Sequence, residues 1–212
     1  MTTAVDYGDL SIEKRTLLVA THNKGKVKEY QELLKDLDAS WIGLDDVGIG
    51  WDVEETGTTF GENAVLKATS YAVASGMLTL ADDSGLEVDA LGGQPGVHTA
   101  RFGGEGLNSE QRYRLLLQKL EQAPWEQRTA RFRCVVSLAD AGGVLATASG
   151  TIEGHIALAP SGNEGFGYDP VFYVLQEQAT MAQLPADVKN RISHRARALS
   201  ALKPRLVKVL AG

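Results

Sequence analysis

The chain has 212 residues, 43% of them hydrophobic, a net charge of −6 at pH 7 and one cysteine. This length and apolar content suit an α/β domain with a sizeable core. The acidic balance lacks the basic footprint of a nucleic-acid-binding protein, and no apolar run is long enough to span a bilayer. The single Cys134 excludes an internal disulfide and indicates a reducing, cytoplasmic compartment.

Residues 1–15 lack the basic-then-apolar order of a signal peptide, and we expect a flexible extension before one domain over 16–212. The apolar run Thr16–Ala20 predicts a strand, and apolar residues at helical spacing from Val27 onward predict a helix. The turn between them consists of Thr21, His22, Asn23, Lys24, Gly25 and Lys26. Its free N–H groups and lysines suit an anion, but an ordinary capped helix with solvated lysines fits equally well.

Apolar and polar residues alternate over 47–53, which predicts a half-buried strand that ends at Glu54 and Glu55. A helix is predicted next, beginning at residue 58 or 59 and running to 76. Lys67 lies on this helix, where it is a solvated surface charge unless a phosphate site is nearby.

The apolar run Met77–Ala81 predicts a buried strand that ends on Asp82-Asp83-Ser84-Gly85. Taken alone, these four residues favour a turn, because their types dominate turns. Neighbouring residues on a strand point to opposite faces, so at most one of the two acids can face a site directly. A return strand is predicted over 86–91, and the glycine-rich run 92–104 is expected to lack regular structure.

The second half of the chain carries clearer signals. A capping box at Asn108 predicts a helix, and alternation predicts a strand over 129–139. The returning strand, 144–158, is expected to break at a glycine, either 150 or 154. Pro204 should kink or divide the last helix, which is predicted to begin near 193.

An unusual glycine-rich loop contains Phe166, Gly167, Tyr168 and Asp169, which have no periodic apolar partner. Aromatic side chains on such a backbone can stack a nucleobase, although Phe166 could instead anchor the loop in the core. Acidic strand ends supply oxygen ligands for Mg²⁺, and a lysine-bearing helix start supplies a cradle for phosphates. Together these features suit a nucleoside triphosphate with magnesium.

The order of the motifs resembles the inosine triphosphate pyrophosphatase family, of the Ham1 type. The resemblance covers nearly all of 17–202. It is carried by residues 20–26 with 29, 54–60 with 62–64 and 67–68, 81–86, 92–96, 165–170, and 189 with 192–195.

The resemblance implies an α/β fold with a mixed central sheet flanked by helices, in two lobes with a long cleft between them, and a homodimer. It implies Mg²⁺-dependent hydrolysis of non-standard purine nucleoside triphosphates (ITP, dITP and XTP) to the monophosphate and pyrophosphate, which cleanses the nucleotide pool. By position, Glu54 and Asp83 would hold Mg²⁺, with Asp83 also the proton acceptor. Substrate contacts would come from Thr21, His22, Asn23, Lys24, Gly25, Lys26, Lys67, Ser84, Phe166, Gly167, Tyr168, Asp169, Lys189, His194 and Arg195.

Two other functions compete with this interpretation. A Maf-like pyrophosphatase of pyrimidine or modified nucleotides would use similar chemistry, and a non-catalytic nucleotide-binding module would keep only the cavity. Selectivity for a 6-keto purine fits Arg195, which can only donate hydrogen bonds. Rejection of guanine needs a further contact at the 2-position of the base, to which the sequence assigns no residue.

Overall fold

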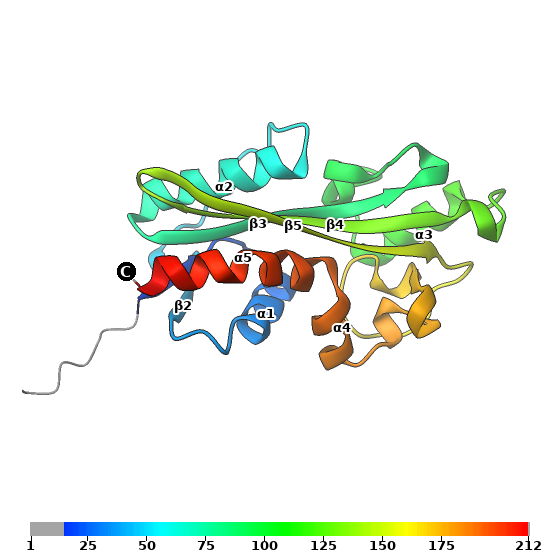
Figure 1. The fold of residues 1–212 in the computed structure, drawn as a ribbon. Coiled ribbons are helices and arrows are strands. Elements are labelled where there is room, and N and C mark those ends of the chain that lie inside the picture. Colours follow the sequence, from blue (N-terminus) through cyan, green and yellow to red (C-terminus); the bar gives the residue numbers. More distant parts are fainter. Residues whose placement is uncertain (1–14, 212) are drawn as a thin grey trace, which may run out of the picture.

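The computed structural model describes residues 15–211. One mixed sheet has the strand order β2-β1-β3-β4-β5-β6-β7, with helices on both faces (Figure 1). The strands are β1 Thr16–Val19, β2 Ser40–Gly43, β3 Leu78–Val88, β4 Thr129–Asp140, β5 Gly143–Ile156, β6 Phe172–Val174 and β7 Ala179–Thr180. The helices are α1 Lys24–Leu33, α2 Phe60–Ser75, α3 Ser109–Lys119, α4 Ala186–Ile192 and α5 His194–Ala211. The predicted mixed sheet flanked by helices is confirmed.

Residues 1–14 of the expected N-terminal extension lie outside the described range. Within that range, Arg15 donates a hydrogen bond to the carbonyl of Val209 (2.8 Å), near the end of α5. The assignment of 16–212 to a single two-lobed domain stays a prediction. No helix between residues 15 and 211 is long and apolar enough to cross a membrane.

The long antiparallel strands β3, β4 and β5 run the length of the molecule, with α2 on one face and α1 and α5 on the other (Figure 1). The parallel strand β1 pairs with β3 only over Leu78–Leu80. Beyond Leu80, β3 therefore keeps β4 on one side, and on the other side residues 15–211 give it only an isolated bridge between Glu87 and Pro95. This open edge is where Asp82, Asp83 and Ser84 lie.

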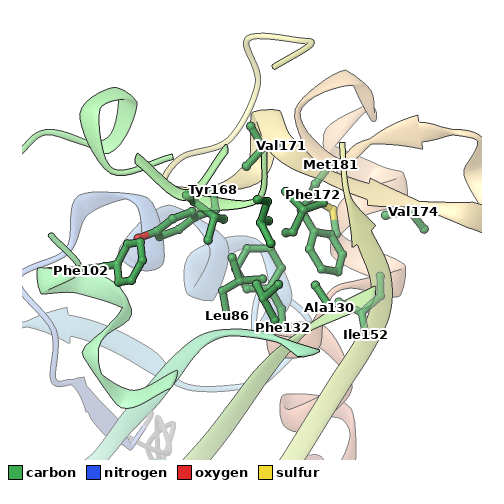
Figure 2. Packing of buried hydrophobic residues seen from close by; sticks show 14 of the residues in the cluster. Leu86, Phe102, Ala130, Phe132, Ile152, Tyr168, Val171, Phe172, Val174 and Met181 are labelled. Atoms are coloured by element: carbon green, nitrogen blue, oxygen red, sulfur yellow. The ribbon is translucent and has the colours of Figure 1, made fainter. Parts of the chain in front are cut away.

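Three groups of buried apolar side chains form the core. One surrounds Leu86, Phe132, Tyr168 and Phe172 at one end of the long strands (Figure 2). The other two lie at the opposite end, one between the sheet and α1 and α5, the second beneath α2. The boundary between the first cluster and the other two falls near residues 82–85 of β3. The open edge of β3 therefore lies between the two ends of the core.

The prediction of a turn at 82–85, followed by a separate strand, is wrong, because β3 runs unbroken to Val88. All ten residues from Thr79 to Val88 are in register with β4. Gly85 serves a close approach rather than a turn. A Cβ there would lie 2.5 Å from both the carbonyl oxygen of Gly96 and Oγ1 of Thr99. The glycine therefore lets a short 3-10 helix, η3 (Gly96–Arg101), pack on the strand, within a segment that we expected to lack regular structure.

The half-buried strand predicted over 47–53 is also wrong. A 3-10 turn ends there at Gly48, whose φ of 70° is left-handed, and no strand follows. The apolar alternation instead reflects packing along α2. Trp51 stacks on Tyr71 with ring centroids 5.1 Å apart, and the backbone N–H of Val53 donates to the Tyr71 hydroxyl (3.2 Å).

The predicted break in β5 and the predicted division of the last helix do not occur. β5 passes through both Gly150 and Gly154 without a break. Gly150 serves a close approach instead, since a Cβ there would lie 2.2 Å from the carbonyl oxygen of His194 and would push α5 off the sheet. α5 continues through Pro204. Pro204 and Ser200, whose carbonyl loses its helical donor, are both exposed, so water can satisfy that carbonyl, while Leu202 and Leu206 stay buried on the other side.

Candidate active site

A cavity of about 430 Å³ lies at the open edge of β3. Residues from α1, α2, β3, η3, α3, the loop before β6, α4 and α5 line it. The predicted site residues on its wall are Thr21, His22, Asn23, Lys26, Lys67, Asp83, Ser84, Phe166, Gly167, Tyr168, Asp169, Lys189, His194 and Arg195. Fold and cavity thus bring together residues from both ends of the sequence.

Three predicted residues do not line the cavity. Lys24 and Glu54 are exposed to solvent outside it. Gly25 lies beneath the ring of Phe166, where a Cβ would come within 2.7 Å of the ring. Gly25 therefore shapes the wall by allowing Phe166 to rest on the start of α1.

The start of α1 is capped as predicted. The Asn23 side chain accepts hydrogen bonds from the backbone N–H groups of Gly25 (2.9 Å) and Lys26 (3.2 Å). Thr21 Oγ1 in turn accepts from the backbone N–H of Asn23 (3.2 Å). The positive end of the helix faces the cavity beside Lys26, which suits an anionic group.

Asp82 and Asp83 point to opposite faces of β3, as strand geometry requires. Asp82 lies on the α1 and α5 side, where it accepts from Lys26 Nζ (2.9 Å) and Arg195 Nη2 (3.3 Å). Burial alone would raise the pKa of Asp82, but the charges of Lys26 and Arg195 outweigh it and hold that pKa well below its usual range. Asp82 is thus a buried, ionised carboxylate that holds two cations beside the cavity.

Asp83 lies on the α2 side and accepts from Lys67 Nζ (3.2 Å) and Asn63 Nδ2 (3.1 Å). Burial raises the pKa of Asp83, and the nearby charge of Lys67 only partly opposes this. A carboxylate that holds a proton more readily than usual, beside a cavity, suits a proton acceptor or a cation ligand.

Glu55, rather than Glu54, faces this group. Lys67 Nζ lies 2.6 Å from Glu55 and 3.2 Å from Asp83, so it bridges the two carboxylates. Arg101 of η3 approaches Glu55 from the other side (3.7 Å). The motif resemblance assigned the metal to Glu54, and strand alternation could not correct that choice, because the expected strand that would have fixed the directions of the two glutamates does not form.

The opposite wall is a buried network of ions. Lys189 Nζ lies 2.6 Å from Asp169 and 2.8 Å from Glu29. Arg195 pairs with Glu29 and donates to Ser84 Oγ (3.0 Å). Sequence reasoning did not make Glu29 a site residue. Its position next to the apolar stripe residue Tyr30, which is buried, was the signal that could have marked it.

The Phe166 ring lies beside both cations of this wall, with Lys189 Nζ 5.0 Å and the Arg195 guanidinium carbon 6.0 Å from its centroid. Phe166 is part of the cavity wall. Its backbone N–H donates to Asp169 (2.9 Å), which fixes the loop. A planar aromatic surface flanked by fixed donors can stack and read a nucleobase.

His194 lies beneath the same wall and stacks on Phe132, with ring centroids 4.9 Å apart. Burial, reinforced by the charge of Arg195, lowers the pKa of His194 well below its usual value. His194 is therefore a neutral imidazole, and any contact with a ligand uses a neutral donor or acceptor.

The cavity wall, as far as residues 15–211 form it, carries one more carboxylate than cationic side chains. The acids are Glu29, Asp52, Glu55, Asp82, Asp83 and Asp169, and the cations are Lys26, Lys67, Arg112, Lys189 and Arg195. A polyphosphate entering alone would therefore meet no net positive charge. A bound divalent cation would correct this balance.

The residues fit a magnesium ion whose coordination is completed by the substrate. No group of three or more His, Cys, Asp or Glu side chains within the described range is placed to hold a metal ion. Mg²⁺ usually takes one or two carboxylates, with substrate phosphates and waters filling its other positions. Asp83 and Glu55, joined by Lys67, provide such a pair of oxygen donors.

Comparison with known proteins decides the family. The sequence model of the Ham1 family matches residues 17–205. The chain belongs to the Ham1 family. It is 49% identical over 190 residues to the dITP/XTP pyrophosphatase of Geobacter sulfurreducens, covering 90% of this chain and 96% of that protein. It is 46% identical over 185 residues to the dITP/XTP pyrophosphatase of Bacillus subtilis, covering 87% and 93% of the two chains.

Solved Ham1 structures share the fold. The HAM1 protein of Coxiella burnetii matches with a TM-score of 0.83 and 41% identity over 92% of this chain and 99% of that one. The Staphylococcus aureus Ham1 protein matches with a TM-score of 0.81 and 40% identity, over 92% and 100%. The α/β architecture expected from the motif order is thus the architecture of this Ham1 protein.

Proposed function

We propose that this Ham1 protein hydrolyses the non-standard purine nucleoside triphosphates ITP, dITP and XTP to the monophosphate and pyrophosphate, and so cleanses the nucleotide pool. The relatives named dITP/XTP pyrophosphatase support the substrate class. The observation that carries the proposal is one cavity with two unlike walls. Asp83, Glu55 and Lys67 form one wall, and Phe166 with the cations Lys189 and Arg195 forms the other.

Magnesium is the proposed cofactor, held by Asp83 and an acid of the 54–55 pair. The motif match favours Glu54, whereas the side chain on the cavity wall is that of Glu55. When bound, Mg²⁺ would polarise the phosphate oxygens and supply positive charge that the wall lacks.

The chain's own groups perform the remaining work. Asp83 accepts the proton of the attacking water, for which its burial and raised pKa prepare it. Lys67 and Lys26 offset the charge that builds on the phosphate chain, beside the positive end of α1. Attack is assigned to the α-phosphorus, which releases pyrophosphate as the leaving group.

Base selection rests on donors that are fixed in place. Arg195 is held by Glu29, Asp82 and Ser84, and a guanidinium can only donate hydrogen bonds. It suits the 6-keto oxygen of hypoxanthine and xanthine, and leaves the 6-amino group of adenine without an acceptor. Such mispairing of a buried polar group discriminates strongly between substrates.

A homodimer and a cytoplasmic location are further parts of the proposal. The lone cysteine, Cys134, is buried on β4, and the sequence contains no second cysteine with which it could form an internal disulfide. This supports a reducing compartment. Sedimentation of the purified chain tests the dimer directly.

A pyrophosphate-release assay against ITP, dITP, XTP, GTP, ATP, dTTP and UTP, with and without a chelator, tests the function. We expect metal-dependent release that is fastest with the hypoxanthine and xanthine nucleotides. A preference for dTTP or UTP would support a Maf-like enzyme instead. Nucleotide binding without any release would reduce the protein to a binding module, and equal rates with ATP and ITP would defeat the role of Arg195.

A further inference from the structure

One cation of the cavity wall differs from the other four. Each of those four forms an ion pair with a wall carboxylate, at 2.9 Å for Lys26, 2.6 Å for Lys67 and 2.6 Å for Lys189, with Arg195 paired to Glu29 and Asp82. The guanidinium of Arg112 forms no hydrogen bond or ion pair with any residue between 15 and 211, and its Nε is buried without a partner. A buried donor without an acceptor is costly unless something else satisfies it.

Arg112 is held in place by its helix. The side chain of Asn108 accepts from the backbone N–H of Gln111, and the Gln111 side chain accepts from the backbone N–H of Asn108, both at 2.9 Å. This capping box fixes the first turn of α3, and Ser109 and Arg112, three residues apart on one side of the helix, both reach the cavity. The unpaired guanidinium is therefore presented by a rigid element.

The position of Arg112 relates it to the base rather than to the phosphates. Leu116 of α3 belongs to the same buried apolar cluster as Tyr168, and Arg112 and Tyr168 both line the cavity. Tyr168 belongs to the same loop as Phe166, and its hydroxyl donates to the carbonyl of Thr99 (3.1 Å). The helices that carry Lys26 and Lys67 pack instead in the other two clusters, α1 through Tyr30 and α2 through Tyr71.

We infer that Arg112 reads the 2-position of the purine base, an inference that rests on the proposed function. Xanthine carries a keto oxygen there, and its ring loses a proton in the neutral pH range, so it offers an anionic acceptor to a guanidinium. Hypoxanthine carries only hydrogen at this position. Guanine carries an amino group, a donor that meets another donor and leaves Arg112 unsatisfied. Arg112 thus favours XTP and rejects GTP.

Replacement of Arg112 by Met, which keeps length and removes the charge and the donors, tests this inference. We expect the ratio of kcat/KM for XTP to that for ITP to fall about tenfold or more, and the ratio for GTP to that for ITP to rise. In the unmodified protein, the XTP to ITP ratio should fall when the pH is lowered through the ionisation of xanthine. This pH dependence should be absent in Arg112→Met.

Arg114→Met is the matched control, because Arg114 lies on the same helix but is exposed and paired with Glu110 (2.7 Å). It should leave both ratios unchanged. A uniform loss for XTP, ITP and GTP in Arg112→Met, at any level of stability, would overturn the inference and indicate a phosphate or structural role. Failure of the unmodified protein to hydrolyse any purine triphosphate would instead overturn the proposed function.

Discussion

The same isosteric change at two neighbouring acids of β3 should have different effects, a loss of stability at Asp82 and a loss of activity at Asp83. The Asp82 side chain is only 1% exposed, and it partners Lys26 and Arg195. Asp82→Asn keeps the shape but removes the charge that compensates both cations. Breaking a buried ion pair costs about 3–5 kcal/mol of unfolding free energy. We expect the lower end, about 3 kcal/mol, because Arg195 keeps Glu29 and Lys26 is near enough to solvent to reorient.

Asp83→Asn should leave stability nearly unchanged and remove activity. Burial disfavours the ionised form of Asp83, so a neutral amide removes that penalty and should change the unfolding free energy by about 1 kcal/mol or less. The same substitution removes the proposed proton acceptor and should abolish most turnover while nucleotide binding stays measurable.

Urea unfolding and thermal melting of the two variants beside the parent protein measure the contrast. For a chain of this size, a loss of 3 kcal/mol corresponds to a fall in Tm of about 6–12 °C. We expect that fall in Asp82→Asn alone. Equal stability losses in the two variants, or a parent-like Tm in Asp82→Asn, would refute the assignment of the two acids to separate structural and chemical roles.

Three further changes test other parts of the structure. Arg128 donates to three backbone carbonyls at 3.0, 3.1 and 2.6 Å, so Arg128→Met should cost about 3 kcal/mol in urea unfolding, and a cost below about 1 kcal/mol would contradict this role. Gly25→Ala places a methyl group 2.7 Å from the Phe166 ring and should raise KM for ITP about tenfold at similar Tm. An unchanged KM would contradict contact between the Phe166 ring and the base. Backbone N–H groups lower the pKa of Glu62 in the folded protein. The stability that Glu62 contributes is therefore present above its unfolded-state pKa and is lost as the pH falls through the lower folded-state pKa. Glu62→Gln should lose less stability than the parent protein between about pH 5 and pH 3, and parallel stability profiles would contradict this.

Local signals in the sequence were sufficient where short-range physics decides the structure. The capping box of Asn108 with Gln111 and the N-cap at Thr59 mark helix starts that the structure confirms. The alternating apolar residues of β4 are buried as predicted, with Cys134 among them. These features depend on neighbours within a few positions, so their residue types carry the information.

The same local reasoning misread residues whose role is set from far along the chain. Gly85 looks like a turn residue, but its lack of a side chain makes room for η3. Asp82 and Asp83 are tolerated inside a strand because lysines and an arginine from other elements pair with them. Strand alternation still predicted that they would face opposite sides, because that rule does not depend on where the strand ends.

Sequence reasoning assembled most of the cavity wall but missed residues that no local pattern marks. Arg112 resembles any polar residue of an amphipathic helix, and only the packing of α3 into the buried cluster that contains Tyr168 brings it to the cavity. The choice between Glu54 and Glu55 likewise depended on how an irregular segment lies on α2. The function depends on these spatial relations, which local sequence patterns do not reveal. The prediction of function therefore came from the motif resemblance.

Hydrolysis of ITP in ¹⁸O-labelled water tests the central claim most directly, because it identifies the phosphorus atom that the attacking water reaches. Mass spectrometry of the products should find the label in the inosine monophosphate, with none in the pyrophosphate. Label in pyrophosphate and none in the monophosphate would contradict attack at the α-phosphorus, and with it the mechanism assigned to this cavity.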